Sequence, residues 1–147
     1  MAHQHLEAGQ AIIETYALQL PRADLYVTRG ELALVEQQWN IAEAWLNDGR
    51  AAAEQHHQPL QATSAQASLG RVAWGRGELD QAIWHLEAAR AEAIPLAARR
   101  LQTQIDLWLA EVYSLRGERL AAEEALSRAE ERLANSTNNL IPAKIPE

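Results

Sequence analysis

The sequence predicts an all-α protein made of antiparallel helix pairs, and three observations lead to that prediction. The apolar 48% of the 147 residues is rich in Ala and Leu, with no Phe and one Met. Ala and Leu, with the abundant Glu, Gln and Arg, are strong helix formers, whereas residues that favour strands are scarce. Prolines and glycines recur at regular intervals along the chain, and one spacing of alanine and leucine occurs twice. The length is that of one domain.

Prolines and turn residues alternate along the chain. The prolines lie 38 and 36 residues apart, at Pro21, Pro59 and Pro95. Proline suits the first turn of a helix, where its missing N–H costs nothing. Between and after the prolines stand Trp39 with Asn40, Gly77 and Gly117. Glycine, and less often asparagine, adopts the left-handed conformation that ends a helix. We therefore expect each proline to open one helix and each glycine or asparagine to turn the chain into a second.

This alternation predicts seven helices in one domain over residues 1–134. The leading helix is expected at 4–19. The pairs are expected at 22–38 with 40–56, 60–76 with 78–93, and 96–116 with 118–134, which gives units over 22–56, 60–93 and 96–134. Apolar spacing supports the helix over 96–116, where one face carries Leu101, Ile105, Trp108, Leu109, Val112 and Tyr113. Residues 135–147 contain two prolines and no apolar period, so we expect an irregular tail or linker there.

The second helices of the last two pairs repeat one packing pattern. The repeated residues are Ala82, Leu86 and Ala89, then Ala122, Leu126 and Ala129. Alanine is suited to positions where two helices must approach closely, and leucine fills the gap between neighbours. The residues between them differ freely. A packing pattern that recurs in this way indicates stacked repeat units.

These residues resemble the tetratricopeptide repeat. The second unit carries the resemblance through Leu69, Gly70, Ala73, Gly77, Leu79, Ala82, Leu86, Ala89 and Pro95. The third unit carries it through Leu109, Ala110, Tyr113, Gly117, Ala122, Leu126 and Ala129. The first unit matches less closely, through Leu32, Val35, Trp39, Ile41, Ala44 and Ala51, and departs from the pattern at Trp39 and Asp48. The leading helix resembles the second half of an earlier unit, with Ala8, Ile12 and Pro21 in register.

The resemblance implies a right-handed α-solenoid of about three antiparallel helix pairs plus the leading helix, with the first helix of each pair lining a concave groove. The interval between units exceeds the roughly 34 residues of the standard repeat. Longer units of this kind are similar to the helical-repeat segment of bacterial regulators of the maltose-activator type. Such regulators also contain a nucleotide-binding module, and the sequence has no P-loop pattern.

Nine positions match the groove-facing places of the resembling family. They are Tyr26, Arg29 and Glu36 in the first unit, Ser64, Arg71 and Trp74 in the second, and Gln104, Leu107 and Glu111 in the third. Trp74, with Arg71 one turn away, is the best candidate for a binding anchor, because tryptophan and arginine dominate binding energetics at interfaces. For the five tryptophans as a group, packing between repeats is the first interpretation.

Other classes of function find little support. The net charge is −7 without a basic cluster, so we expect no nucleic acid partner. No apolar stretch approaches the roughly 20 residues of a membrane span, and no signal peptide pattern opens the chain, so we expect no membrane contact and a cytoplasmic location. Cysteine is absent, and the adjacent His56 and His57 diverge on a helix, so no metal site or cofactor is expected. The acidic pairs near Glu123 and Glu130 belong to a charged surface, so we expect no enzyme.

Two functions remain. The first is a scaffold that binds a protein or a peptide in the concave groove. The second is an effector-sensing or self-association segment of a larger bacterial signalling or transcription regulator, in which the partner is a small molecule or a second copy of the chain. A small-molecule sensor would have a closed apolar pocket around Trp74 or Trp108.

Overall fold

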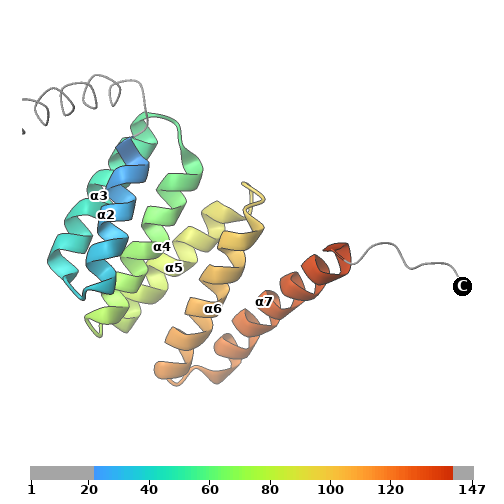
Figure 1. Cartoon of the computed structure of the whole chain (residues 1–147). Coiled ribbons are helices and arrows are strands. Elements are labelled where there is room, and N and C mark those ends of the chain that lie inside the picture. The colour runs from blue at the N-terminus through green and yellow to red at the C-terminus, as the bar shows by residue number, and fades with distance from the viewer. Residues whose placement is uncertain (1–21, 141–147) are drawn as a thin grey trace, which may run out of the picture.

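The computed structural model describes the backbone of residues 22–140 and the side chains of residues 22–137 (Figure 1). This range contains six helices and no strand. The helices are α2 (Arg22–Val35), α3 (Trp39–Gln55), α4 (Pro59–Gly75), α5 (Leu79–Ala93), α6 (Arg99–Leu115) and α7 (Arg119–Leu140). The all-α prediction is confirmed for the described residues. The count there is six rather than the predicted seven, because the expected helix at 4–19 lies outside them.

Two predicted boundaries are corrected. Pro59 is the first residue of α4, as predicted, but Pro95 lies in a turn and α6 begins only at Arg99. The delay arises because Ala97 adopts a left-handed φ of 53° that a helix cannot contain. At the other end, α7 runs to Leu140, into the segment where we expected an irregular tail. The first proline after this helix is Pro142, so 135–140 contain no residue that forbids helical hydrogen bonding.

The five turns between the described helices share one backbone geometry. Each contains a residue with positive φ, and these residues lie 20 positions apart, at Gln37, His57, Gly77, Ala97 and Gly117. The amide that follows each of them donates to the carbonyl five residues back, as in Glu78 N to Ala73 O at 2.9 Å. This is the Schellman arrangement, which satisfies the last carbonyls of a helix. Every helix with its turn therefore occupies the same length of chain, and one pair occupies twice that length.

The common interval corrects the alignment of the first unit. The turn residue there is Gln37, two positions before Trp39, and Trp39 is the first residue of α3. The matching through Leu32, Val35 and Trp39 is therefore displaced by two residues. With Gln37 aligned to Gly77 and Gly117, the same residue types fall together in all three units, in the sets Ala42/Ala82/Ala122 and Leu46/Leu86/Leu126. Gln37 was missed because it adopts the left-handed conformation without being glycine.

The helix pairs lie side by side in an open stack from α2 to α7 (Figure 1). Each helix packs on the next, and α4 also contacts both α2 and α6. Among the described helices, α3, α5 and α7 make no comparable contact with one another. The first helices of the pairs, α2, α4 and α6, therefore form one layer, which we call the inner layer, and the second helices form the outer layer.

The two helices of a pair approach closely at a recurring position of the repeat. A Cβ atom on Gly30 would lie 2.6 Å from Leu46 Cγ, and one on Gly70 would lie 2.8 Å from Leu86 Cγ. Leu46 and Leu86 are fully buried. In these two pairs the missing side chain of glycine leaves the space that the buried leucine occupies. The third pair has Ala110 at this position, and its Leu126 is 42% exposed.

A polar position recurs between the inner and outer layers, at Tyr26, Gln66 and Asp106. Asp106 is fully buried on α6, and its Oδ1 accepts hydrogen bonds from Arg128 at 2.9 and 3.1 Å. Its Oδ2 accepts a bond from Arg132 at 2.5 Å, and Arg90 Nε of α5 lies 3.5 Å from Oδ1. One carboxylate thus connects three consecutive helices, α5, α6 and α7.

The left-handed turns predict that the same Ala to Gly substitution changes the free energy of unfolding in opposite directions in a turn and inside a helix. Ala97→Gly should raise the free energy of unfolding by about 0.5–1 kcal/mol, because relief of left-handed strain outweighs the entropy cost of glycine. Ala44→Gly, at an exposed position inside α3, should lower it by about 1 kcal/mol. Urea unfolding of both variants measures the difference. Two changes of the same sign would contradict the turn geometry.

The buried carboxylate makes a second prediction. Asp106→Asn should lower the free energy of unfolding by about 3 kcal/mol, because it leaves three partly buried arginines without their counter-charge. The matched control is Asp80→Asn, whose side chain is 81% exposed and pairs with Arg116 at 2.9 Å. This exposed pair should contribute less than about 1 kcal/mol. Equal losses in urea unfolding would show that the Asp106 cluster has no special role.

Candidate binding groove

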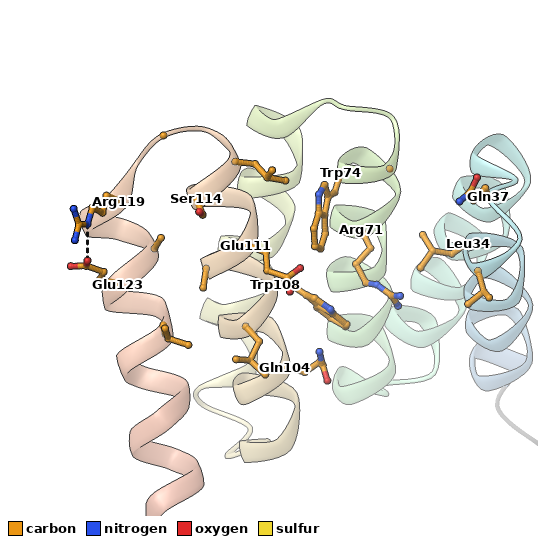
Figure 2. Close-up of a pocket in the computed structure, with 18 of the residues that line it drawn as sticks. Leu34, Gln37, Arg71, Trp74, Gln104, Trp108, Glu111, Ser114, Arg119 and Glu123 are labelled. Atoms are coloured by element: carbon orange, nitrogen blue, oxygen red, sulfur yellow. Dashed lines mark hydrogen bonds and ion pairs between the residues drawn. The ribbon is translucent and has the colours of Figure 1, made fainter.

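The inner layer contains an open groove of about 1350 Å³ (Figure 2). Most of its lining comes from the second halves of α2, α4 and α6, with further residues at the beginning of α3 and of α7. A smaller hollow of about 660 Å³ lies along the first halves of the same three inner helices, and Gln104 lines both. The two hollows together follow the inner layer across all three pairs. The arrangement suits a ligand that crosses the helices rather than one enclosed between them.

Three large side chains form the centre of the groove. The Arg71 guanidinium of α4 lies 4.7 Å from the centroid of the Trp108 ring on α6. Trp74 lies one turn further along α4, and Figure 2 shows Trp74, Arg71 and Trp108 around the same space. This cation–π contact contributes about 0.5–2 kcal/mol and holds the guanidinium over the ring. The centre therefore offers a held positive charge beside two half-buried aromatic surfaces.

Burial lowers the pKa of Arg71, and the charge of Glu31 on α2 acts in the opposite direction. Because the ordinary pKa of arginine is above 12, Arg71 stays protonated. The salt bridges among the described residues do not include Arg71. Its N–H donors can thus serve a carboxylate on a bound ligand, where two parallel hydrogen bonds can form.

Charges alternate along the inner layer at the position that Arg71 occupies. The corresponding residues, 40 positions apart, are Glu31 on α2 and Glu111 on α6. Glu31 accepts a hydrogen bond from Ser68 Oγ at 3.3 Å and lines the smaller hollow, whereas Arg71 and Glu111 line the groove. From the first pair to the third, the charges along one side of the concave surface are therefore negative, positive and negative. We call Glu31, Arg71 and Glu111 the charge row.

Six of the nine predicted site residues line these hollows. Arg71, Trp74, Gln104, Leu107 and Glu111 line the groove, and Ser64 lines the smaller hollow. They share the second and third units, where glycine at the turn gave the correct alignment. These six positions are the part of the prediction that the structure brings together.

The three candidates of the first unit lie elsewhere. Tyr26 and Arg29 pack on Trp45 of α3, with ring centroids 5.6 Å apart and the guanidinium 5.1 Å from the ring. Glu36 is exposed in the turn after α2. None of the three lines either hollow. The physical reason is the two-residue displacement in the alignment of the first unit. Two residues correspond to a rotation of about 200° around a helix, so each predicted residue points away from the groove-facing position.

The first-unit residues that do line the two hollows were not identified from the sequence. Leu34 corresponds to Trp74 and lines the groove, while Asp24 and Glu31 line the smaller hollow. Trp39 also lines the groove, and its ring rests on Gly75, where a Cβ would collide with it. The recurrence of glycine at Gly30 and Gly70, 40 positions apart, was the signal that could have placed them.

The described residues contain no group of three or more His, Cys, Asp or Glu that could hold a metal ion. None of the described helices is both long enough and apolar enough to cross a bilayer.

Comparison with known proteins gives one similarity. Over 108 residues, 74% of this chain, the sequence is 32% identical to a Tonsoku-like protein from Bos taurus. The chain spans 8% of the length of that protein. No family model matches the chain, and no solved structure matches it. These findings show no similarity to regulators of the maltose-activator type, so that part of the resemblance stays a prediction.

Proposed function

We propose that this chain is a protein-interaction scaffold that binds an extended segment of a partner protein along the inner layer. The observation that carries the proposal is the centre of the groove, where Arg71 is held against Trp108 beside Trp74. Arginine and tryptophan in a partly buried setting are the residue types that supply most of the binding energy at interfaces. A continuous surface over three stacked pairs suits a peptide chain.

The shape of the groove favours a peptide over a small effector. Typical small-molecule pockets enclose roughly 300–1,000 Å³ and bury most of the ligand. Here Trp74 and Trp108 border a larger and open space that also contains the charges of Arg71 and Glu111. A closed apolar pocket, which the small-effector alternative requires, is not what these two tryptophans form.

The charge row indicates the chemistry of the partner. A segment that crosses α2, α4 and α6 would complement it with basic, acidic and basic side chains in turn. Packed helices lie about 8–10 Å apart, and an extended peptide in the polyproline II conformation advances about 3.1 Å per residue and brings every third side chain to the same side. The complementary charges should therefore recur about every three residues. An apolar side chain next to the acidic residue would contact Trp74, which lies one turn from Arg71 on α4.

The similarity to part of a Tonsoku-like protein is compatible with this proposal. A unit that stacks on copies of itself can recur inside longer chains. The matched stretch, 108 residues, is longer than two helix pairs of this chain, and it covers a small part of the relative. The function proposed for this chain depends on the chemistry of the groove and not on this similarity.

Selection from a random-peptide display library tests the proposal. The unaltered chain should enrich peptides with basic, acidic and basic residues about three positions apart. Arg71→Glu should weaken binding of the selected peptides at least tenfold and should enrich a basic residue at the central position instead. Trp74→Ala should weaken binding by a similar factor, because it removes the aromatic anchor. Fluorescence anisotropy with one selected peptide measures these losses.

Trp84→Ala is the matched control. Trp84 is 66% exposed on α5 in the outer layer and does not line the groove. The same Trp to Ala change there should leave peptide affinity unchanged. Circular dichroism of each variant confirms that it is folded. Failure to enrich any charge pattern, or equal losses from Trp74→Ala and Trp84→Ala, would overturn the groove as the binding site.

A further inference from the structure

The first end of the stack exposes a helix face that is buried in both later units. We call Leu25, Arg29 and Leu32 of α2 the end face. Leu25 is 52% exposed and Leu32 is 60% exposed. The residues 40 and 80 positions later are almost completely buried, namely Ala65, Leu69 and Val72 on α4 and Ile105, Leu109 and Val112 on α6. Arg29 rests on Trp45 of α3, but the two leucines of the end face belong to a contact surface of the repeat that the described residues leave exposed.

The second helix of the preceding unit covers the equivalent faces. Ala65, Leu69 and Val72 share one core cluster with Ala42 and Leu46 of α3. Ile105, Leu109 and Val112 share another with Ala82, Leu86 and Ala89 of α5. The second helices share a fixed pattern that also packs on the first helix of their own pair. In it an alanine is followed four residues later by leucine and three residues after that by a small residue.

The same pattern occurs once more, one full repeat before α3. Residues at this spacing are Ala2, Leu6, Gly9 and Ile13, which correspond to Ala42, Leu46, Gly49 and Ala53 of α3. Alanine stands at the first of these positions in all four sets, leucine stands at the second, and glycine or alanine stands at the third. These N-terminal residues lie outside the described range. Their spacing differs from the leading helix expected at 4–19, in which Ala8 and Ile12 were aligned.

From this pattern and the open end face we propose that residues 2–15 dock on the end face as the second helix of a preceding unit. The occupant is thus a segment of this chain. Ala2 and Leu6 would pack on the end face as Ala42 and Leu46 of α3 pack on α4.

A polar pair supports the same register. Arg76, which follows α4, pairs with Glu43 of α3. The residues 40 positions earlier are Glu36 and His3, so the acidic partner has moved to the other side of the pair. A neutral imidazole can donate its N–H to a carboxylate, so these two residue types suit one contact position.

The aromatic cluster at the first end also has an open side. At the equivalent positions, Asp106 lies between two outer helices, since it contacts Arg90 of α5 as well as Arg128 and Arg132 of α7. Tyr26 contacts Trp45 of α3, the outer helix on one side. The outer helix on its other side is the one that residues 2–15 would supply.

Hydrogen exchange on the full chain tests the proposal. The amides of residues 5–13 should exchange at least tenfold more slowly than in the double variant Leu25→Asp and Leu32→Asp, because helix formation there depends on the end face. The control is Leu133→Asp on α7, which is also 52% exposed and lies at the far end of the stack. It should leave protection of residues 5–13 unchanged. Slow exchange of α4–α6 in every variant confirms that the stack remains folded.

Cross-linking gives an independent measurement, because the chain has no cysteine of its own. The variant His3→Cys with Glu36→Cys should form an intramolecular link with a short bismaleimide. The control is His3→Cys with Arg116→Cys, which places the second thiol at the equivalent position of the last unit and should not link.

Unprotected amides at 5–13, or equal linking of both variants, would overturn the proposal. Protection that increases with protein concentration, with links between molecules, would overturn it in favour of a second copy. Peptide binding in the groove is a separate measurement, so its failure is distinguishable from this one.

Discussion

Helix length is the constraint on which this structure depends. Each of the five turns between the described helices places a left-handed residue 20 positions after the last one, and the same backbone hydrogen bonds close every turn. Three of the five residues, Gln37, His57 and Ala97, are not glycine, so the conformation costs about 1–2 kcal/mol at each of them. The interval is retained at that cost because it brings the same helix face to the same neighbour in every unit. The close crossings at Gly30 and Gly70 require that agreement.

The same constraint aligns the polar side chains. Residues 40 positions apart occupy equivalent places on α2, α4 and α6, so Glu31, Arg71 and Glu111 form a row although nothing links them in the sequence. Differences between units then give each place its chemistry. At one position between the two layers the three units carry Tyr26, Gln66 and Asp106, whose partners are a tryptophan, a histidine and a set of arginines. The repeat thus fixes where a side chain lies and leaves its identity free.

The fold class and the pairing of helices could be predicted from sequence, because helix-forming composition, Gly77 and Gly117 are local signals. The first unit could not be aligned in the same way, since Gln37 adopts positive φ under tertiary constraint and has no mark in the sequence. All three of Arg29, Arg71 and Trp74 were predicted to face the groove, and this one difference explains why Arg71 and Trp74 line it and Arg29 does not. The Asp106 cluster was also beyond prediction, because its arginines lie on two other helices and a lone aspartate in a helix resembles a surface residue.

The short turns also limit how such a chain can change in length over evolution. Three residues separate α2 from α3, α3 from α4 and α4 from α5, so these connections have little slack to absorb an insertion. One added residue inside a helix would rotate all that follows by about 100° and move both the glycine crossings and the charge row off their partners. Gain or loss of one complete pair with its turns would leave every remaining contact intact. Relatives of this protein should therefore differ from it in whole pairs of helices, and the length of the segment that they bind should change in the same steps.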